Sequence, residues 1–346
     1  MKAVYLTQHG GPEVLTYGDL PEPAIGPNDV KIRVRACALN RLDLFTRAGV
    51  RGTRIKTAGP HILGGDIAGD VAEVGSAVTS LKPGDRVVVN PRITCGQCRA
   101  CVSGETELCV APGMIGSTKS GGYAEYAKAP AVNAMPLPAS LSYVQAASLP
   151  TVFLPCWSIL LRRAALKPWE TALILSASSG VGTAAIQVAK RVIGARVIAT
   201  TSSDEKARRA KELGADEVVN YKTEDVAERV KSLTGGRGVE VVVDHVGADA
   251  WPYATASLAV GGRYGICGVT SGYKVELQMG LMFLRHQTVF GVFMGRNGDL
   301  RQIVDVAGKG VIKGVVHATY PLEETRKAHE EMEKLDFFGK LVLTVP

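Results

Sequence analysis

The sequence predicts an α/β protein with two domains, one a doubly wound parallel sheet and the other mostly β. The first observation is length, because 346 residues are enough for two ordinary domains. The second is that residues 1 to about 135 are rich in Gly, Pro and β-branched residues. The third is that short apolar segments alternate with helical patterns after that point. We expect one domain over 1–135, a second over 136–285, and a return of 286–346 to the first.

In the first domain, strands are expected where β-branched residues lie between turn residues. These segments are KIRVRACAL (31–39), IAGDVAEVGS (67–76) and DRVVVNP (85–91). Near the end of the chain, ETRKAHEEMEKL (324–335) is predicted to be a helix. The segment GKLVLTV (339–345) follows as a strand, which we expect to rejoin the sheet of the first domain.

In the second domain, strands and helices alternate at the spacing of a parallel sheet that is covered on both faces. One helix is expected over 203–214, with Ser203 or Asp204 as its N-cap and Gly214 as its stop. A further helix over 155–168 is expected to bridge the two domains. The remaining segments are the strands at 171–176, 195–201, 217–221, 239–247, 261–269 and near 287–293, and the helices at 181–193 and 224–235.

The composition limits the partners and the location. The formal net charge is +7, but no dense Lys/Arg block with interleaved aromatic residues occurs, so nucleic-acid binding is not expected. Charged residues, Gly or Pro interrupt every apolar stretch before the roughly 18 residues that a membrane span needs. The opening MKAVYLTQHG is typical of a strand and not of a signal peptide. A cytoplasmic enzyme with a small-molecule substrate is therefore the expectation.

A glycine-rich turn follows the strand predicted at 171–176. Gly180-x-Gly182-x-x-Ala185 is a dinucleotide-binding fingerprint with Ala in its third place. The first Gly permits the tight turn, the second allows backbone N–H groups close to the phosphates, and the helix that follows offers its positive end. The residues expected around the phosphates are Ser179, Gly180, Val181, Gly182 and Thr183.

The end of the next strand predicts which nicotinamide cofactor binds. An NAD site usually carries Asp or Glu there to hold the ribose 2′-hydroxyl, but this chain has Thr200, Thr201 and Ser202. Lys206 follows on the next helix and would attract a 2′-phosphate. We therefore expect NADPH. Lys206, with Arg208 and Arg209 on the same helix, would also suit a helix face that is only exposed to solvent.

Four of the seven cysteines lie close together in the sequence. Their spacing, C-x2-C-x2-C-x7-C, suits a tetrahedral Zn²⁺ with four thiolate ligands. Such a closed site has no position for water, so this zinc would stabilise a lobe and take no part in chemistry. An iron–sulfur cluster or disulfides are the alternatives, although disulfides suit a cytosolic chain poorly. The predicted ligands are Cys95, Cys98, Cys101 and Cys109.

Together, these motifs resemble the medium-chain dehydrogenase/reductase superfamily over essentially the whole chain. The resemblance implies a GroES-like catalytic domain split around a Rossmann domain, with the active site in the cleft between them. It also implies a homodimer or homotetramer. The segments that carry it are GPEVL (11–15), ALNRLDLFTRAG (38–49), GGDIAGDVAEVGS (64–76), KPGDRV (82–87), GGYAEY (121–126), SSGVGTAAIQVAK (178–190), ELGADEVVNY (212–221) and GKLVL (339–343).

The positions that hold a second, catalytic zinc in the alcohol dehydrogenases of this family carry other residues here. The first Cys position falls on Asn40, the His of a Gly-His-Glu motif falls on Gly65, and the third ligand falls on Thr151. Amide, glycine and hydroxyl groups make no soft zinc site. The resemblance therefore implies that the structural zinc is retained and the catalytic zinc is missing.

Without that zinc, the chain is similar to the quinone oxidoreductase and enoyl reductase branch of the family. Asn40, Asp43 and Arg47 match the N-x-x-D-x-x-x-R pattern of that branch, and the resemblance makes them the candidate catalytic residues. Asp43 and Arg47 would equally suit packing and hydrogen-bond support. The resemblance implies that NADPH gives hydride to an activated C=C bond or reduces a quinone, with the acceptor's own conjugation as the electron sink. The cofactor contacts that it implies are Ser202, Lys206 and Tyr221 for the 2′-phosphate, and Gly268, Phe290 and Lys340 for the nicotinamide and ribose.

Two other functions remain open. One is a zinc alcohol dehydrogenase whose ligands have changed, in which a metal would still manage the alkoxide. The other, from a different class, is a sensor or structural protein that binds NADPH with little turnover.

Overall fold

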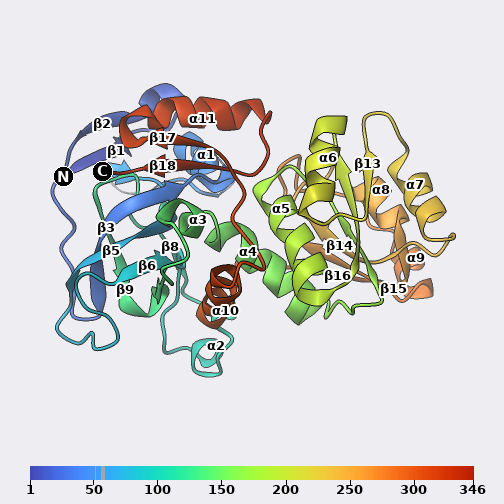
Figure 1. Ribbon diagram of the computed structural model, residues 1–346, viewed down its shortest axis with the longest axis horizontal. Helices are drawn as coiled ribbons and strands as arrows, with labels where there is room; N and C mark the ends of the chain where they lie inside the picture. Colours follow the sequence, from blue (N-terminus) through green and yellow to red (C-terminus); the bar gives the residue numbers. More distant parts are fainter. Residues whose placement is uncertain (51, 56–58) are drawn as a thin grey trace. The chain divides into compact units, whose positions relative to one another are not determined.

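The computed structural model describes residues 1–50, 52–55 and 59–346 (Figure 1). The chain divides into unit 1, Met1–Thr151 with Arg296–Pro346, and unit 2, Val152–Gly295. Both divisions lie later in the chain than the boundaries predicted from the sequence, which were 135/136 and 285/286. At the first division, α3 (Tyr143–Ala147) packs against the strands β3 (Asp29–Ala38) and β5 (Asp66–Val74), so it belongs to unit 1. At the second division, α10 (Asn297–Gly308) contacts β10 (Ala134–Pro136) of unit 1.

Unit 1 is mostly β, as predicted. Its main sheet has seven strands in the order β10-β6-β5-β3-β18-β17, with β9 also paired to β3. The closing strand β18 pairs antiparallel with β3, which confirms its predicted return. Smaller sheets join β2-β1-β4 and β7-β8. The strands are β1 (Lys2–Leu6), β2 (Thr16–Asp19), β3 (Asp29–Ala38), β4 (His61–Ile62), β5 (Asp66–Val74), β6 (Arg86–Val89), β7 (Arg92–Ile93), β8 (Gly113–Met114), β9 (Tyr126–Pro130), β10 (Ala134–Pro136), β17 (Val316–Pro321) and β18 (Lys340–Thr344).

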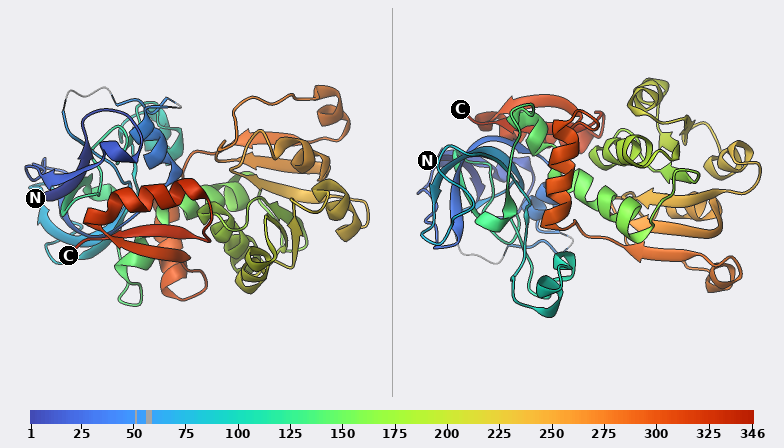
Figure 2. Two further views of the ribbon diagram at one scale, coloured as in Figure 1. Left: turned by 90° about the horizontal axis from the view of Figure 1, so that it is seen from above. Right: turned by 60° about the horizontal axis from the view of Figure 1, so that its bottom comes forward.

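The helices of unit 1 are few and lie against these strands. The predicted helix near the C-terminus is α11 (Thr325–Lys334), which contacts β17 and β18 (Figure 2). The sequence reasoning missed α10, although Leu300, Ile303, Val304 and Ala307 are buried at helical spacing. The remaining helices are α1 (Arg41–Ala48) and α2 (Arg99–Val102), with 3-10 turns at Pro12–Val14, Thr106–Leu108, Ala131–Asn133 and Leu322–Glu324.

Unit 2 is the predicted doubly wound sheet. Six parallel strands lie in the order β13-β12-β11-β14-β15-β16, so the chain reverses direction across the sheet between β11 and β14. Helices α5 and α6 pack together, as do α7 and α8. The elements are β11 (Thr171–Ile174), α5 (Gly180–Gln187) continued by a π-helix at Val188–Ile193, β12 (Arg196–Thr201), α6 (Asp204–Leu213), β13 (Glu217–Asn220), α7 (Val226–Leu233), β14 (Val239–Asp244), α8 (Trp251–Ala256), β15 (Leu258–Ile266), α9 (Met279–Leu284) and β16 (Thr288–Gly291).

The helix predicted over 155–168 begins and ends earlier than expected. It comprises α4 (Pro150–Trp157) and a π-helical turn at Ser158–Arg163, and the division between the units falls inside α4. Pro150 explains the early start, because proline at the first helical position loses no hydrogen bond. The end follows from Ala165, whose φ of 48° is outside the right-handed helical region.

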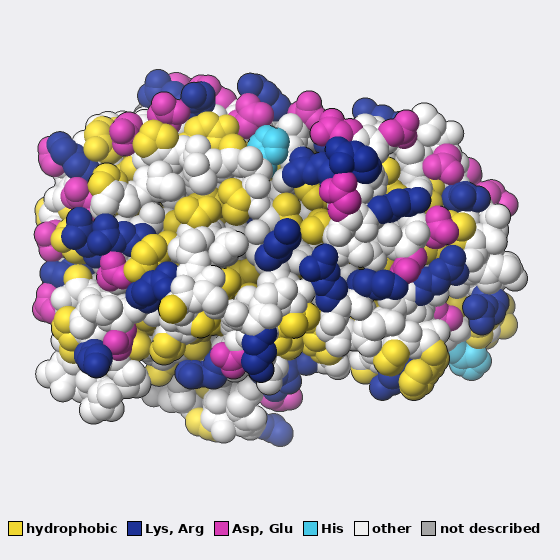
Figure 3. All heavy atoms as spheres, viewed as in Figure 1, with side chains coloured by type: hydrophobic (Ala, Val, Ile, Leu, Met, Phe, Trp, Pro, Cys, Tyr) yellow, Lys and Arg dark blue, Asp and Glu magenta, His cyan; other side chains and the backbone are white. Residues whose placement is uncertain are grey.

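Each unit has its own apolar core. The core of unit 1 gathers residues from β3, β5 and β18, and that of unit 2 lies around β11, β14 and α8. On the face shown in Figure 3, Lys and Arg side chains are spread out with Asp and Glu among them. No helix in the described part of the chain is long and apolar enough to cross a membrane.

Candidate functional site

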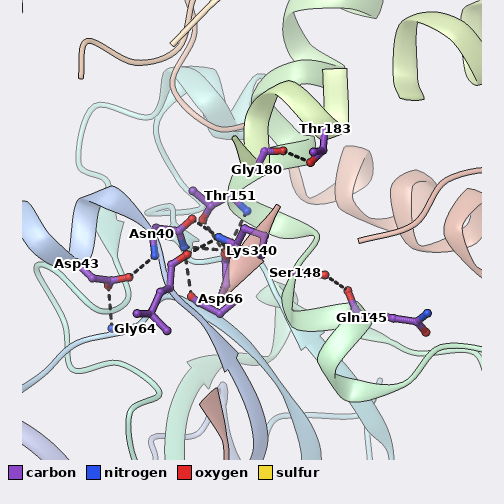
Figure 4. Close-up of polar contacts among 12 residues, drawn as sticks. Asn40, Asp43, Gly64, Asp66, Gln145, Ser148, Thr151, Gly180, Thr183 and Lys340 are labelled. Carbon is purple, nitrogen blue, oxygen red and sulfur yellow. Dashed lines mark hydrogen bonds and ion pairs between the residues drawn. The ribbon is translucent and has the colours of Figure 1, made fainter. Parts of the chain in front are cut away.

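A cluster of polar side chains forms where α1 and β5 begin in unit 1. Asn40 precedes α1, and Asp66 is the first residue of β5. The amide nitrogen of Asn40 donates to one carboxylate oxygen of Asp66 at 2.9 Å. Thr151 donates to the other oxygen twice, from its hydroxyl at 2.6 Å and from its backbone N–H at 3.1 Å. Three segments far apart in the sequence therefore meet at one buried carboxylate (Figure 4).

Lys340 completes this cluster from the start of β18. Its ammonium donates to the carbonyl oxygen of Leu39 at 2.6 Å and to Asn40 Oδ1 at 2.5 Å, and it lies 3.4 Å from Asp66 Oδ2. Burial lowers the pKa of Lys340, while the nearby carboxylates act in the opposite direction. The resemblance implies a cofactor contact for this lysine, but these three acceptors use all the protons of its ammonium.

The family's three zinc-ligand positions all fall in or beside this cluster. Asn40 and Thr151 hold Asp66, as described, and Gly65 immediately precedes it. A Cβ atom at position 65 would lie 2.8 Å from the carbonyl oxygen of Ile115 and 3.0 Å from Cβ of Pro91. A histidine at that position would therefore need a shift of the backbone around Ile115.

Asp43 fixes the geometry beneath the cluster. One carboxylate oxygen accepts from the backbone N–H of Asn40 at 2.7 Å, and the other accepts from that of Gly64 at 3.1 Å. The helix α1 is thus tied to the turn that carries Asp66. Burial raises the pKa of Asp43 to about 7, against the opposing effect of these two backbone hydrogen bonds. Two backbone N–H groups and the Tyr123 hydroxyl thus bond the Asp43 carboxyl, which suits a positioning role.

Arg47 lies away from the cluster and anchors α1 to α11. It donates to Nδ1 of His329 at 3.1 Å and to the carbonyl oxygen of Gly10 at 3.2 Å, and it pairs with Glu333. His329 in turn lies 3.3 Å from the hydroxyl of Tyr123. Burial beside this guanidinium lowers the pKa of His329 to about 3, so the imidazole is neutral. Arg47 therefore holds α1 against α11, away from the Asp66 cluster.

In unit 2, the glycine-rich turn has the local structure that binding of a pyrophosphate needs. Ser179 caps α5, with its hydroxyl accepting from the backbone N–H of Gly182 at 2.8 Å. A Cβ atom at position 182 would lie 2.2 Å from the carbonyl oxygen of Ser176, so only glycine fits. Thr183 donates back to the carbonyl oxygen of Gly180 at 2.8 Å (Figure 4). The side chain of Val181 is part-exposed beside the turn.

The residues predicted to bind the 2′-phosphate follow neighbouring strands. Ser202 comes directly after β12, Lys206 lies in the first turn of α6, and Tyr221 comes directly after β13. The backbone N–H of Tyr221 bonds the carbonyl oxygen of Thr201 at 3.0 Å, which brings the two strand ends together. The side chain of Tyr221 is 43% exposed.

Two further residues predicted for the cofactor lie at the other half of this sheet. A Cβ atom at Gly268 would be 2.9 Å from the carbonyl oxygen of His245, so the backbone after β15 runs close to the residue after β14. Phe290 is buried in β16, and the guanidinium of Arg163 lies over its ring at 5.0 Å. Its ring therefore belongs mainly to the packing of unit 2.

Two buried polar atoms at the carboxyl edge of this sheet have no hydrogen-bond partner among the described residues: Thr201 Oγ1, at the end of β12, and His245 Nδ1, directly after β14. Buried polar groups are nearly always paired, so orphaned ones at this edge indicate a missing ligand. The sequence reasoning placed Thr201 here but missed His245. With the Gly182 turn, these atoms fit a pyridine nucleotide.

The four predicted cysteine ligands come together in unit 1. Their sulfur atoms lie within 4.8 Å of one another, and those of Cys95 and Cys101 are 3.9 Å apart. Backbone N–H donors, chiefly that of Val110, lower the pKa of Cys98 to about 6, which favours a thiolate. A tetrahedral Zn²⁺ with Zn–S bonds near 2.3 Å needs S···S separations of about 3.8 Å. The donor set therefore fits zinc.

Two protein-family models match this chain. Residues 26–139 match the alcohol dehydrogenase GroES-like domain, and residues 180–309 match the zinc-binding dehydrogenase domain. A crystal structure of an NAD-dependent alcohol dehydrogenase is 42% identical, with a TM-score of 0.96 and full coverage of both chains.

Curated relatives carry more than one activity in their names. An NAD-dependent alcohol dehydrogenase of Sulfurisphaera tokodaii is 32% identical, with 99% of each chain covered. An acryloyl-coenzyme A reductase of Metallosphaera sedula is 33% identical over 99% of this chain and 100% of that protein. The chain is therefore an oxidoreductase that belongs to the medium-chain dehydrogenase/reductase superfamily.

Proposed function

We propose that this protein transfers hydride from NADPH to an activated C=C bond of an enone or enoyl thioester, or to a quinone, without zinc at the reaction centre. The observation that carries the proposal is the Lys340–Asp66 pair in the cluster. An ammonium with a carboxylate partner occupies the neighbourhood of the family's ligand positions, and position 65 has no room for histidine. The acryloyl-coenzyme A reductase among the relatives supports this substrate class.

Asn40 is the residue of the cluster that we assign to the acceptor. It is part-exposed, and one of its amide protons is directed to Asp66. The nearest acceptor for the other proton, the carbonyl oxygen of Ala38, is 3.5 Å away and therefore makes only a weak contact. That N–H would donate to the carbonyl oxygen of the acceptor as negative charge develops there. Preorganised donors of this kind typically contribute a hundredfold or more to the rate.

When bound, a nicotinamide nucleotide would supply the hydride for the β-carbon of the acceptor, the π-electrons would move to the carbonyl oxygen, and water would supply the proton. Lys340 and Asp66 hold Asn40 in one orientation, and Asp43 holds its backbone. Positioning and charge stabilisation are thus the contributions of this chain.

The test combines a substrate panel with metal analysis of the same sample. We expect NADPH oxidation with at least one enone, enoyl-coenzyme A or quinone, and one zinc per chain held by the four cysteines. Asn40→Ala should lower kcat about a hundredfold and leave the Kd of NADPH unchanged, whereas the exposed Asn28→Ala serves as control. Two zincs per chain, with the second lost together with activity on chelation, would overturn the proposal.

The second candidate is alcohol oxidation, which the names of two of the similar proteins favour. It requires a group that manages the alkoxide, and the cluster offers Lys340 and not a vacant set of soft ligands. Oxidation of simple alcohols with NADP⁺ or NAD⁺, in the absence of activity toward the panel, would support this candidate.

The oligomer that we propose is a homodimer or homotetramer formed through unit 2. Strand β16 is an edge of the parallel sheet, so its outer backbone groups are open to pairing with a second copy. Large apolar side chains are exposed just before it and just after it, including Met279, Phe283, Leu284 and Phe293. A monomer mass in light scattering would contradict this assignment.

A further inference from the structure

His245 holds the turn that caps α5 through a side-chain hydrogen bond. Its Nε2 lies 2.7 Å from the hydroxyl oxygen of Ser179. That hydroxyl directs its single proton to the carbonyl oxygen of Ser176 at 2.9 Å and accepts from Gly182 N–H. With its proton directed to Ser176, the hydroxyl oxygen accepts from the imidazole, which places a proton on Nε2 and leaves Nδ1 as a bare acceptor.

The second ring nitrogen, Nδ1, is buried and lacks a partner throughout the described chain. Burial lowers the pKa of His245 to about 4, so the ring is neutral near pH 7 and Nδ1 stays unprotonated. A bare acceptor does not bind an ionised phosphate, which also offers only acceptors. The group that fits it is a hydroxyl or an amide N–H.

The position of His245 in the sheet indicates which half of a dinucleotide it faces. It follows β14, the first strand beyond the reversal of strand order. Strands β11, β12 and β13 form the half that reads the adenosine ribose, and β14, β15 and β16 form the other mononucleotide half. The Thr270 hydroxyl bonds the His245 carbonyl oxygen at 3.0 Å, which fixes the backbone at this point.

We propose that His245 binds the nicotinamide half of the cofactor, with Nδ1 accepting a hydrogen bond from a ribose hydroxyl or from the carboxamide N–H. This inference rests on the proposed binding of a pyridine nucleotide. It assigns to one imidazole two tasks, because Nε2 orients the cap of the phosphate turn while Nδ1 reads the opposite half of the same ligand.

The two tasks can be separated with His245→Gln. The glutamine amide can place an N–H donor near Nε2, which keeps the bond to Ser179, but it offers no acceptor at the position of Nδ1. We expect the Kd of NADPH and of NADH to rise about tenfold. The Kd of adenosine 2′,5′-bisphosphate and of AMP, which lack the nicotinamide half, should stay within twofold. The exposed His317→Gln is the matched control.

A second measurement distinguishes ligand contact from support of the turn. Nitrogen-15 NMR of histidine-labelled protein should show one unprotonated His245 nitrogen, whose signal shifts when NADPH is added and stays in place when AMP is added. If His245→Gln lost the same affinity for dinucleotides and for adenosine ligands, His245 would only support the structure of the turn. If it lost no affinity for either, His245 would not contact the cofactor. Either result overturns the inference.

The two proposals fail in different ways. If the dinucleotides bind with the expected His245 dependence while no acceptor in the panel is reduced, the proposed reaction is wrong and this inference stands. If acceptors are reduced but His245→Gln binds both cofactors normally, the inference is wrong and the proposed reaction stands.

Discussion

The cluster around Asp66 in unit 1 and the sheet edge around His245 in unit 2 differ in how their polar atoms are satisfied. Both carboxylate oxygens of Asp66 and all three ammonium protons of Lys340 have partners within the cluster. At the sheet edge, Thr201 Oγ1 and His245 Nδ1 have none among the described residues. The cluster is complete in itself, whereas the edge needs a ligand to complete it.

This difference distinguishes residues that hold a site in place from residues that contact the ligand. A saturated cluster can orient one remaining donor, such as the second N–H of Asn40, but has few groups to offer a cofactor. An unsaturated edge is costly to bury and is expected where a ligand returns the lost hydrogen bonds. Substitutions in the cluster should therefore act first on stability, and those at the edge on affinity.

The largest expected effect is that of Asp66→Ala. It leaves the buried ammonium of Lys340 without its carboxylate, and breaking such a pair typically costs 3–5 kcal/mol, so we expect the free energy of unfolding to fall by about 4 kcal/mol. Adding Lys340→Met should recover part of that loss, because no unpaired charge remains. Urea unfolding of the single and double variants measures both effects.

Asp70→Ala is the matched control, since Asp70 lies on the same strand but its pair with Arg35 is partly exposed. We expect a loss of roughly 1 kcal/mol there. If Asp66→Ala lowers the free energy of unfolding no more than Asp70→Ala does, the Asp66 cluster is not the buried charge network described above.

An intermediate effect is expected from Asp43→Asn, in the pH dependence of stability. The pKa of Asp43 rises from 3.8 to about 7 on folding because of burial. The folded state therefore holds this proton more tightly, so the contribution to stability is full below pH 4 and is lost as the pH rises through 7. From pH 5 to pH 8 the unmodified protein should lose about 2.5 kcal/mol more than Asp43→Asn in urea unfolding. Parallel pH profiles of the two proteins would contradict this.

The smallest expected effect sharpens the comparison at the sheet edge. Lys206→Ala should raise the Kd of NADPH about tenfold, through loss of an ionic contact with the 2′-phosphate, and leave that of NADH within twofold. Lys211→Ala, in the last turn of the same helix, is the control. Equal affinity for both cofactors in the unmodified protein would show that this edge does not read the 2′-phosphate.

Much of the fold is predictable because its signals are local. The Gly180–Gly182 turn lies between a short apolar strand and a helix, and Ser203 and Gly214 mark the ends of α6 as expected. The four cysteines between Cys95 and Cys109 also lie in one short segment, and the structure brings their sulfur atoms together. In contrast, α10 was missed even though its buried positions repeat at helical spacing. Gly298 and Gly308, which lie in its first and last turns, have low helix propensity.

The polar networks were harder to predict because they join distant segments. Asp66 meets Lys340 across 274 positions, and His329 meets Arg47 across 282. No local pattern marks such pairs, and the resemblance assigned Lys340 to the cofactor. His245 was missed for the same reason, because its partner Ser179 lies 66 positions earlier in the chain. The chemistry of single residues could be read from the sequence, but their partners depend on how the strands assemble.

The tight packing at Gly65 also restricts how this lineage can change. Histidine there collides with the backbone at Ile115, and cysteine at position 40 or 151 would remove a partner of Asp66 before any metal could bind. Each single replacement toward a set of soft zinc ligands at these positions therefore weakens the Asp66 cluster before a metal could bind. Building such a set here would require several coordinated changes.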